Sequence, residues 1–445
     1  MVATFVHLSD IHFGQEREGG ALAINTDARR QLLKDAADVV AALPQGRASG
    51  IIVTGDVAYA GKQKEYVDAG NWLDQLAECV GCEPSDIQLI PGNHDIDRGK
   101  IAGAAAWMLE TIYRDGEAAL DQFLGSDVDR EVLYSRFHAY RPFADAYQCP
   151  LDCAGENSAD RRVELSAHRA LRFVRMNSAL ICTKDQEEYG NLLLGARQRV
   201  LHEAAGEELV VLVHHPLNWI SDADDARKYL RGRARVVMTG HEHLASVDIE
   251  RVEDGCELMM IAAGATTPDK IDNKYTYAYN VIEFDWEGDQ DALAVTIHPR
   301  RWNDDLKRFE ADDGRLGDYA GRNVLGSPNF RRGNKVHAEV APAAQGENAE
   351  VEIVVPEEDN VTLGGNVSDT EFQNLHLRFF RDLGAGDRLR ILVELDAVPP
   401  GMRGNFTHDI ESRLLRNVAK GERFAELKEK VIAALAKRNG VGGEK

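Results

Sequence analysis

The sequence predicts an α/β fold in which two packed β-sheets are flanked by helices. Near the N-terminus, short apolar runs alternate with helical patterns in a βαβαβ order, which is typical of a mainly parallel sheet with right-handed crossovers. From residue 246 to 298 the pattern changes to strand after strand. Both patterns lie within the first 300 residues of a 445-residue chain, so we expect a large domain followed by a smaller one.

The elements of the large domain follow in order along the chain. Helices are expected where apolar residues recur at helical spacing, over 21–43, 62–80 and 196–205. Strands are expected where short apolar runs are bounded by turn residues. These runs lie at 4–8, 51–53, 87–90, 163–165, 171–176, 210–213, 236–238, 258–263, 275–284 and 293–297.

Five of the apolar runs end in residues that carry Asp, His or Asn side chains. Because open α/β sheets place their sites at the carboxyl ends of strands, we expect these side chains to meet at one edge. The five strand ends are Ser9-Asp10-Ile11-His12, Thr54-Gly55-Asp56, Gly92-Asn93-His94-Asp95, His214-His215-Pro216 and Gly240-His241-Glu242-His243.

Taken together, these strand ends resemble the full motif series of the calcineurin-like metallophosphoesterases, over roughly residues 1–300. The resemblance implies a four-layer αββα sandwich with a dinuclear metal centre. It implies that Asp56 bridges two metal ions and that His215 is a neighbour of the ligands. The remaining ligands would be Asp10, His12 and His243 for one ion, and Asn93, His214 and His241 for the other.

The resemblance also implies that His94 and Asp95 are catalytic. His94 would donate a proton to the leaving group or stabilise its negative charge, and Asp95 would orient that imidazole. A hydroxide that bridges the two ions would attack the phosphoester, so we expect a metal-dependent, phosphodiesterase-like hydrolase. Imidazole, carboxylate and amide ligands without a thiolate suit Mn, Fe or Zn, and the sequence does not choose between these metals.

The charge of the chain bears on the substrate. Lys and Arg total 52 against 74 for Asp and Glu, and the resulting net charge of -22 repels a polyanion. A small nucleotide or cyclic-nucleotide phosphodiester is therefore expected, with a DNA or RNA nuclease as the alternative and a phosphoprotein or sugar phosphate third. A non-catalytic binding scaffold is least favoured, because every ligand position carries a coordinating side chain.

A basic run precedes the motif at 240–243. Such a run is typical of a solvated helix face, and a role in binding the substrate phosphate is the alternative. The run consists of Arg227, Lys228, Arg231, Arg233 and Arg235.

Residues 98–160 form a predicted helical insertion within a domain that spans 1–338. The aromatic residues of the insertion fit helices whose apolar faces pack on the sheet, and a cap over the metal site is the alternative because the insertion follows the Asn93-His94 turn. Residues 299–337 are rich in charge, Gly and Asn, and we expect surface connections there.

A linker at 339–350 and a small, mainly helical module at 351–445 complete the predicted organisation. A strand candidate at 351–355 precedes two helices, which carry apolar faces. In size, position and apolar spacing the module resembles the small adaptor domains appended to effectors in bacterial conflict systems, which implies a protein partner. A helical extension packed on the catalytic domain is the alternative. The two apolar faces are Phe372, Leu375, Phe379 and Leu383, and Phe424, Leu427, Val431 and Leu435.

The cellular location expected from the sequence is the cytoplasm. No signal peptide is visible, and no apolar run approaches the roughly 20 residues that cross a bilayer, so no membrane partner is expected. Six cysteines in a chain of this length suit a reducing compartment. Free thiols are favoured over the alternative of a structural zinc held by Cys79, Cys82, Cys149 and Cys153.

Overall fold

The computed structural model describes residues 2–15, 22–183, 189–252, 256–268, 275–339, 369–399, 408–420 and 423–441. The chain divides into two compact units, Met1–Val336 and His337–Lys445. The strand candidate at 351–355, and all of the predicted linker after Glu339, lie outside the described residues.

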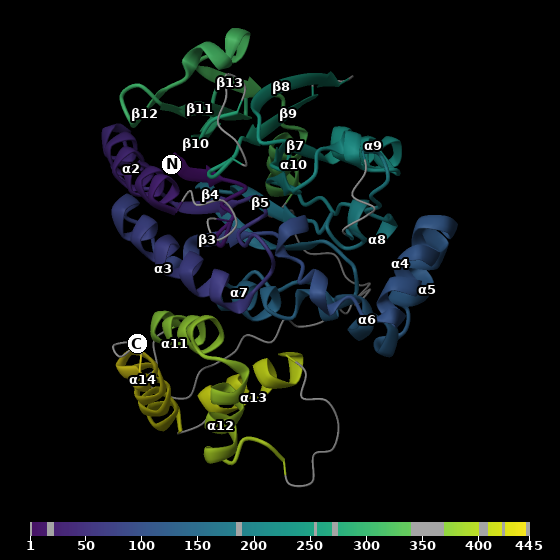
Figure 1. The fold of residues 1–445 in the computed structure, drawn as a ribbon. Helices are drawn as coiled ribbons and strands as arrows, with labels where there is room; N and C mark the ends of the chain where they lie inside the picture. The colour runs from purple at the N-terminus through teal and green to yellow at the C-terminus, as the bar shows by residue number, and fades with distance from the viewer. Residues whose placement is uncertain are drawn as a thin grey trace, which may run out of the picture. The chain divides into compact units, whose positions relative to one another are not determined.

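Two β-sheets form the centre of the first unit (Figure 1). The strands are β1 (Ala3–Leu8), β2 (Gly50–Val53), β3 (Ile87–Leu89), β4 (Ser158–Ser166), β5 (Arg169–Arg175), β6 (Glu207–Leu212), β7 (Ala234–Thr239), β8 (Ala245–Val252), β9 (Cys256–Ala263), β10 (Ala278–Glu287), β11 (Ala292–Asn303), β12 (Arg308–Ala311) and β13 (Arg322–Leu325). One sheet has the order β12-β11-β10-β1-β2-β3, with β13 beside β11, and the other has the order β4-β5-β6-β7-β9-β8.

Parallel pairing joins one group of neighbouring strands in each sheet. β1, β2 and β3 pair in parallel, and so do β5, β6, β7 and β9. The other pairs between these strands are antiparallel, including β1 with β10 and β4 with β5. The parallel order expected from the sequence therefore holds for these strands, and the predicted site residues follow five of them, β1, β2, β3, β6 and β7.

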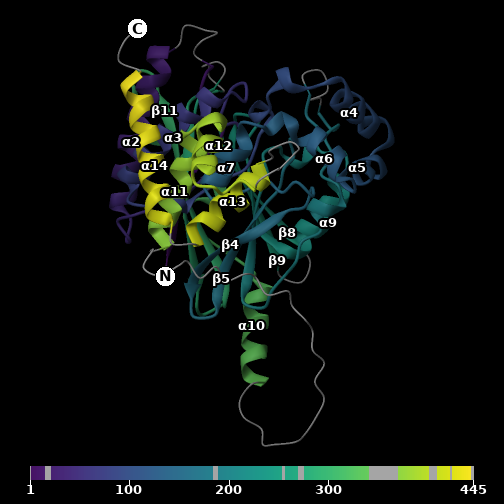
Figure 2. The ribbon, with the colours of Figure 1, turned by 90° about the horizontal axis from the view of Figure 1, so that it is seen from below.

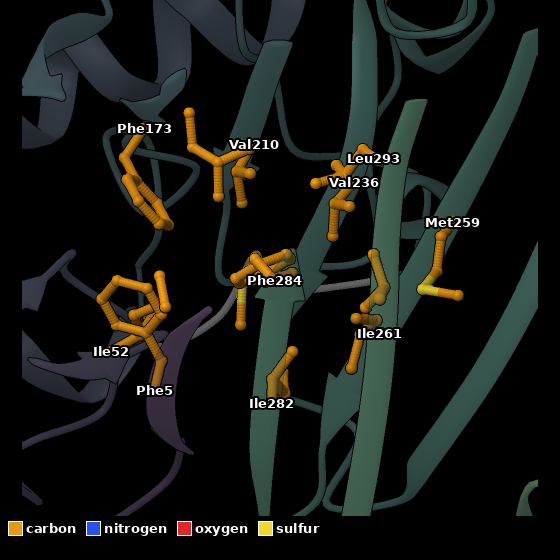
Figure 3. Close-up of a cluster of buried hydrophobic side chains, with 14 of the residues drawn as sticks. Phe5, Ile52, Phe173, Val210, Val236, Met259, Ile261, Ile282, Phe284 and Leu293 are labelled. Carbon is orange, nitrogen blue, oxygen red and sulfur yellow. The ribbon is translucent and has the colours of Figure 1, made fainter. Parts of the chain in front are cut away.

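An apolar core lies between the two sheets (Figure 3). Phe5 of β1 packs edge-on against Phe173 of β5, with the ring centroids 5.3 Å apart, and against Phe284 of β10 at 6.0 Å. β1, β2, β6 and β7 are buried along their whole length, and most of their residues are apolar. Each large apolar side chain in such a core contributes about 1.5–3 kcal/mol of burial free energy.

Helices cover the outer faces of both sheets and complete the four-layer αββα arrangement. α2 (Leu22–Ala42) and α3 (Gln63–Val80) lie side by side next to the first sheet, and α9 (Ala223–Arg233) packs against β7 and β9 of the second (Figure 1). α3 buries the predicted apolar side, including Trp72, and ends at Gly81, whose φ of 75° gives a left-handed cap.

The insertion is helical, as predicted, and its aromatic residues pack. Its helices are α4 (Gly103–Asp115), α5 (Glu117–Leu124), α6 (Asp127–Tyr134) and α7 (Tyr140–Ala146). Phe143 of α7 lies 4.9 Å from Tyr66 of α3, ring to ring, and Tyr140 lies 6.0 Å from the same ring. α7 therefore supports the sheet edge from which the 92–95 turn emerges.

Two predictions about local structure are wrong. The helix expected over 196–205 is only α8 (Ala196–Arg199), because Asn157 Nδ2 donates to the carbonyls of Gln198 and Val200 and so replaces helical partners. The surface connections expected at 299–337 include β12, β13 and α10 (Pro328–Glu339). Charged residues on edge strands conceal the strand pattern there.

α10 belongs to the first unit through its N-terminal turn. The backbone N–H groups of Asn329 and Phe330 donate to Glu208 Oε1 at 2.8 and 3.2 Å, and Phe330 is fully buried in the core. The carbonyl of Asn329 accepts the N–H of Gly206 over 2.8 Å. The start of α10 lies by the first residue of β5, since the guanidinium of Arg169 is 5.9 Å from the centre of the Phe330 ring.

The second unit contains a small helical core of its own (Figure 2). Its described helices are α11 (Asp369–Asp382), α12 (Ala385–Glu394), α13 (His408–Lys420) and α14 (Phe424–Val441). Phe379, Leu415 and Leu427 are fully buried, and a buried Arg388–Glu411 ion pair of 2.8 Å links α12 to α13. The apolar faces predicted for α11 and α14 are buried except at Phe372 and Leu435, which are half-buried.

Among the described residues, every helix is too short or too polar to cross a membrane.

Candidate metal centre

The loops after the parallel strands hold their predicted ligands in an uncommon backbone conformation. A non-glycine residue with positive φ costs of order 1–3 kcal/mol, and such strain clusters at functional sites. Five of the seven predicted metal ligands adopt it. They are Asp10, His12, Asp56, His241 and His243, with φ between 52° and 67°.

Two glycines allow these loops to approach one another. A Cβ at Gly92 would overlap Oδ1 of Asp56, and a Cβ at Gly55 would overlap Nδ1 of His214. Gly55 also has a φ of 98°, a backbone conformation that residues with a side chain rarely adopt. Glycine at both positions is therefore a requirement for bringing Asp56 between the neighbouring loops.

The carboxylate of Asp56 is shared by two imidazoles from different loops. Its Oδ2 lies 3.3 Å from Nε2 of His12 and 3.3 Å from Nε2 of His214. Its Oδ1 accepts the backbone N–H of His94 over 2.8 Å, which fixes the carboxylate in this position. One side chain thus reaches both groups of potential ligands.

The first group consists of Asp10, His12 and His243, whose ligand atoms lie within 4.8 Å of one another. Oδ1 of Asp10 is 3.3 Å from Nε2 of His243, and Oδ2 accepts the backbone N–H of His241 over 3.1 Å. Nδ1 of His12 lies 3.2 Å from the carbonyl of Thr267, which directs the other ring nitrogen towards Asp56.

The second group meets at the amide of Asn93. Its Oδ1 lies 3.1 Å from Nε2 of His214 and 3.1 Å from Nδ1 of His241. Nδ1 of His214 lies 2.7 Å from the carbonyl of Thr54, so this nitrogen donates and Nε2 faces the centre. His214 and Asp56 also offer ligand atoms within 4.8 Å of Asp10, which connects the two groups.

The centre carries an excess of acceptor atoms that a cation would balance. Burial disfavours ionisation of Asp10, but the neighbouring His243 and His214 outweigh it and lower the pKa of Asp10 to about 2. Oδ1 of Asp10 is buried, with the imidazole Nε2 of His243 3.3 Å away. Burial also opposes a charge on His214, yet the charge of Asp56 raises the pKa of His214 to about 9.

His214 would therefore take up a second proton unless a metal ion supplied the positive charge. The donor set contains imidazoles, carboxylates and an amide oxygen, which fits Mn, Fe or Zn. The residues present thus fit a dinuclear centre.

His94 is positioned by a backbone carbonyl. Its Nδ1 lies 2.7 Å from the carbonyl of Tyr59, so Nδ1 donates and Nε2 remains to exchange a proton. The ring stacks on that of Tyr59 at 5.1 Å and lies 4.8 Å from the ring of His12. Burial lowers the pKa of His94, although the charge of Asp56 opposes this shift.

Asp95 binds the loops and not the imidazole of His94. Its Oδ1 accepts from the backbone N–H of Ala58 and the hydroxyl of Tyr66, both at 3.0 Å. Its Oδ2 accepts from the N–H groups of Val57 at 3.3 Å and Gly92 at 2.9 Å. Burial raises the pKa of Asp95 to about 7, with the charge of Asp56 adding to the shift. The contact expected between Asp95 and the imidazole is not among those of the described residues.

His215 lies behind the second group. Its Nδ1 is 2.8 Å from the hydroxyl of Ser178, and its ring is 4.3 Å from that of His241. A ligand atom of His215 also lies within 4.8 Å of those of His214 and His241.

The side chains of the basic run at 227–235 form ion pairs with carboxylates. Arg227 and Arg231 pair with Glu250 at 3.4 and 3.0 Å, and Arg235 pairs with the buried Glu208 at 3.5 Å. Lys228 and Arg233 likewise pair with Asp225 and Glu203. These contacts favour the helix face over a phosphate-binding role for the four residues of α9, whereas Arg235 is fully buried in β7 and is not part of a solvated face.

Within the described parts of the chain the six cysteines form no disulfide, and none joins a cluster that could hold a metal.

Sequence reasoning missed the carbonyls of Thr54, Tyr59 and Thr267, which orient three of the imidazoles. Any residue type supplies a backbone carbonyl, so the sequence holds no direct signal for them. Their positions next to the motifs are the available clue, since Thr54 precedes Gly55-Asp56 and Tyr59 follows three residues later.

Several known proteins are similar to the chain. Sulfate thiohydrolase SoxB of Thermus thermophilus is 13% identical, with 76% of this chain and 59% of that chain covered and a TM-score of 0.32. Vps29 of Entamoeba histolytica is 10% identical, with 72% and 99% covered and a TM-score of 0.30. A hypothetical protein, also from Thermus thermophilus, is 17% identical, with 68% and 99% covered and a TM-score of 0.31. The chain thus spans less than two thirds of SoxB.

No curated protein matches the chain. Residues 371–433 match the GTPase-associated adaptor domain, in agreement with the resemblance predicted for the helical module. Residues 3–245 match the calcineurin-like phosphoesterase model, which confirms the resemblance predicted from the strand ends. This match spans more than half of the 445 residues and includes all of the motifs described above. The chain belongs to the calcineurin-like phosphoesterase family.

Proposed function

We propose that this protein is a dinuclear metal-dependent phosphodiesterase that hydrolyses a small nucleotide or cyclic-nucleotide phosphodiester. The observation that carries the proposal is the position of Asp56 Oδ2, 3.3 Å from an imidazole nitrogen of each ligand group. The family supports the reaction class, and the net charge of -22 supports a small substrate over a polyanion.

Seven side chains would hold two metal ions. When bound, such ions polarise the phosphoryl oxygens and lower the pKa of the attacking water. Asp56 would serve both ions, and the remaining six divide between them. They are Asp10, His12 and His243 on one side, and Asn93, His214 and His241 on the other.

His94 would protonate the leaving oxygen through Nε2. The carbonyl of Tyr59 holds Nδ1, so the ring is already oriented before the substrate arrives. Because burial lowers the pKa of His94, the neutral ring must gain a proton before it can act as an acid. Asp95 would position the two loops that carry Asp56 and Asn93, through its backbone hydrogen bonds.

A DNA or RNA nuclease is the second candidate, and basic residues near His94 favour it. Arg98 and Lys100 lie in the short turn that follows Asn93–Asp95. Lys62 forms an ion pair with Asp97, which immediately precedes that turn. A phosphate adjacent to the scissile one would meet these cations.

The reaction class and the substrate are tested together by a screen of the full chain loaded with Mn²⁺. Cyclic nucleotides, nucleotide diesters, single-stranded DNA and RNA, and simple phosphoesters are compared by kcat/KM. We expect the small nucleotide diesters to be hydrolysed best, and the Asp56→Asn variant to hydrolyse none of them. Preference for the nucleic acids would establish the second candidate, and no turnover of any phosphoester would contradict the reaction class.

The helical module would bind a protein partner, as its match to an adaptor domain supports. The candidate metal ligands all lie between Asp10 and His243, outside this module. Its role would therefore be recruitment, with the chemistry left to the first unit.

A further inference from the structure

A row of aromatic rings leads outwards from the candidate metal centre. The ring of Trp219 lies 4.3 Å from that of His241, and the ring of Tyr189 lies 5.7 Å from that of Trp219. Trp219 is half-buried, whereas Tyr189 is 65% exposed. An accessible aromatic surface therefore begins one ring away from a candidate ligand.

Trp219 is held rigidly in this row. Its indole Nε1 donates to Oε1 of Glu242 over 3.1 Å, and Asn218 Nδ2 donates to the same oxygen over 3.2 Å. Its backbone N–H bonds the carbonyl of Pro216 over 2.9 Å, and its carbonyl accepts the N–H of Leu192 over 3.0 Å. A ring fixed at both its backbone and its edge loses little conformational entropy when a ligand contacts it.

The sequence explains why the indole lies beside the metal centre. Trp219 ends the single turn Leu217–Trp219 that follows His214-His215-Pro216, and Glu242 lies between His241 and His243. The bond from Trp219 to Glu242 therefore joins two of the loops that carry ligand residues. Any group bound to the ring is placed with respect to those ligands.

We propose that Trp219 and Tyr189 form the subsite for the base of a nucleotide substrate. The inference rests on the proposed function, since it names the substrate class of the same site. In a nucleotide, one sugar separates the phosphate from the base, so a phosphate at the metal ligands brings the base within reach of these rings. Every nucleobase has a π-face that stacks on aromatic side chains, so the subsite accepts different bases.

An exposed aromatic residue elsewhere in the unit provides the matched control. Trp107 of α4 is 59% exposed, and its ring packs at 5.7 Å against Phe123 within the helical insertion. Trp107 resembles Tyr189 in exposure, but its ring contacts a residue of the helical insertion and not the row of rings that begins at His241. Replacing Trp107 therefore reports the general effect of losing a surface aromatic ring.

Two chromogenic phosphodiesters isolate the contribution of the base. The p-nitrophenyl ester of thymidine 5′-monophosphate carries a base, methyl p-nitrophenyl phosphate does not, and both release nitrophenolate. For Tyr189→Ala and Trp219→Ala in the Mn²⁺-loaded full chain, we expect kcat/KM for the thymidine ester to fall about 5- to 100-fold, mainly through KM. For Tyr189→Ala, which leaves the Trp219–Glu242 bond intact, the methyl ester should change less than about 2-fold, and Tyr189→Phe and Trp107→Ala should behave as wild type.

A binding measurement separates failure of the subsite from failure of the proposed activity. Calorimetry compares adenosine 5′-monophosphate with ribose 5-phosphate, on the wild type and on Tyr189→Ala. Tighter binding of the nucleotide that disappears in Tyr189→Ala supports the subsite, even if neither ester is hydrolysed. Equal affinity for the two ligands, or equal losses of kcat/KM for both esters, would overturn it.

Discussion

The backbone N–H of His94 donates to Oδ1 of Asp56 over 2.8 Å. This bond ties the carboxylate shared by two ligand groups to the turn that carries the proposed proton donor. Oδ2 of the same carboxylate is then free to face the imidazoles of His12 and His214. Oδ1 of Asp56 therefore fixes the loop, and Oδ2 is placed to hold cations.

Asp56→Asn is expected to abolish turnover together with metal binding. The amide is a weak neutral ligand, and its NH₂ group must face either the imidazoles or the N–H of His94. Metal content of the folded variant and kcat on a nitrophenyl diester are the measurements. Asp225→Asn serves as the control, since Asp225 is exposed and pairs with Lys228 on α9. Two ions per chain with wild-type activity would show that Asp56 is not the shared ligand.

His94→Ala should retain both ions and turn over about 10²- to 10⁴-fold more slowly, the usual contribution of a positioned acid. The loss should shrink for esters with good leaving groups such as nitrophenolate, because these need no proton. The measurement is kcat against leaving-group pKa, with metal content determined in parallel. A constant loss across the series would exclude the acid role.

The site residues could be inferred from sequence because their signal is a repeated pattern. Each motif follows an apolar run, and parallel strands bring such ends to one edge, so Asp10, Asp56 and His214 could be expected to meet. The backbone acceptors that orient the imidazoles could not be inferred from the sequence. The carbonyl of Thr267, for example, comes from a segment more than 250 residues after His12.

Strands that are fully buried could be predicted from the sequence, whereas partly exposed strands could not. Fully buried strands such as β6 and β7 contain short uninterrupted apolar runs, at 209–212 and 236–238, and these runs identify the strands in the sequence. β12 has a mixed pattern, with Phe309 buried against Trp302 and Arg308 exposed, so its charges resemble those of a loop. Edge strands carry such charges because they protect the open edge.

Asp95→Asn is expected to act through structure and metal affinity. An amide has one acceptor oxygen, so some of the four donors around Asp95 would face its NH₂ group. The cost is about 1–3 kcal/mol of unfolding free energy, measured by urea denaturation. Tyr66→Phe removes a single donor and should cost about 1 kcal/mol.

Metal dependence distinguishes this positioning role from a catalytic one. Excess Mn²⁺ should restore much of the activity of Asp95→Asn, because the ligands remain and only their arrangement is loosened. The same excess should leave His94→Ala slow. If Asp95→Asn keeps wild-type stability and metal affinity but loses kcat, Asp95 takes part in the chemistry directly.

The last prediction concerns the division of labour between the two units. A chain that ends at Ala344 keeps α10 and the whole αββα core but lacks the helical module. We expect it to fold, to bind two metal ions and to hydrolyse a small phosphodiester at a rate close to that of the full chain. Circular dichroism, metal analysis and kcat/KM are the measurements.

A slightly shorter chain provides the contrast. Ending at Gly326 removes Phe330 from the core and removes the N–H groups of Asn329 and Phe330 from Glu208, which stays buried beside Arg235. Losing a large buried aromatic residue alone costs about 3–5 kcal/mol, so this chain should be insoluble or unfolded. If the chain ending at Ala344 also fails to fold or to hold metal, the helical module is part of the catalytic fold. The recruiting role proposed for it would then have to be abandoned.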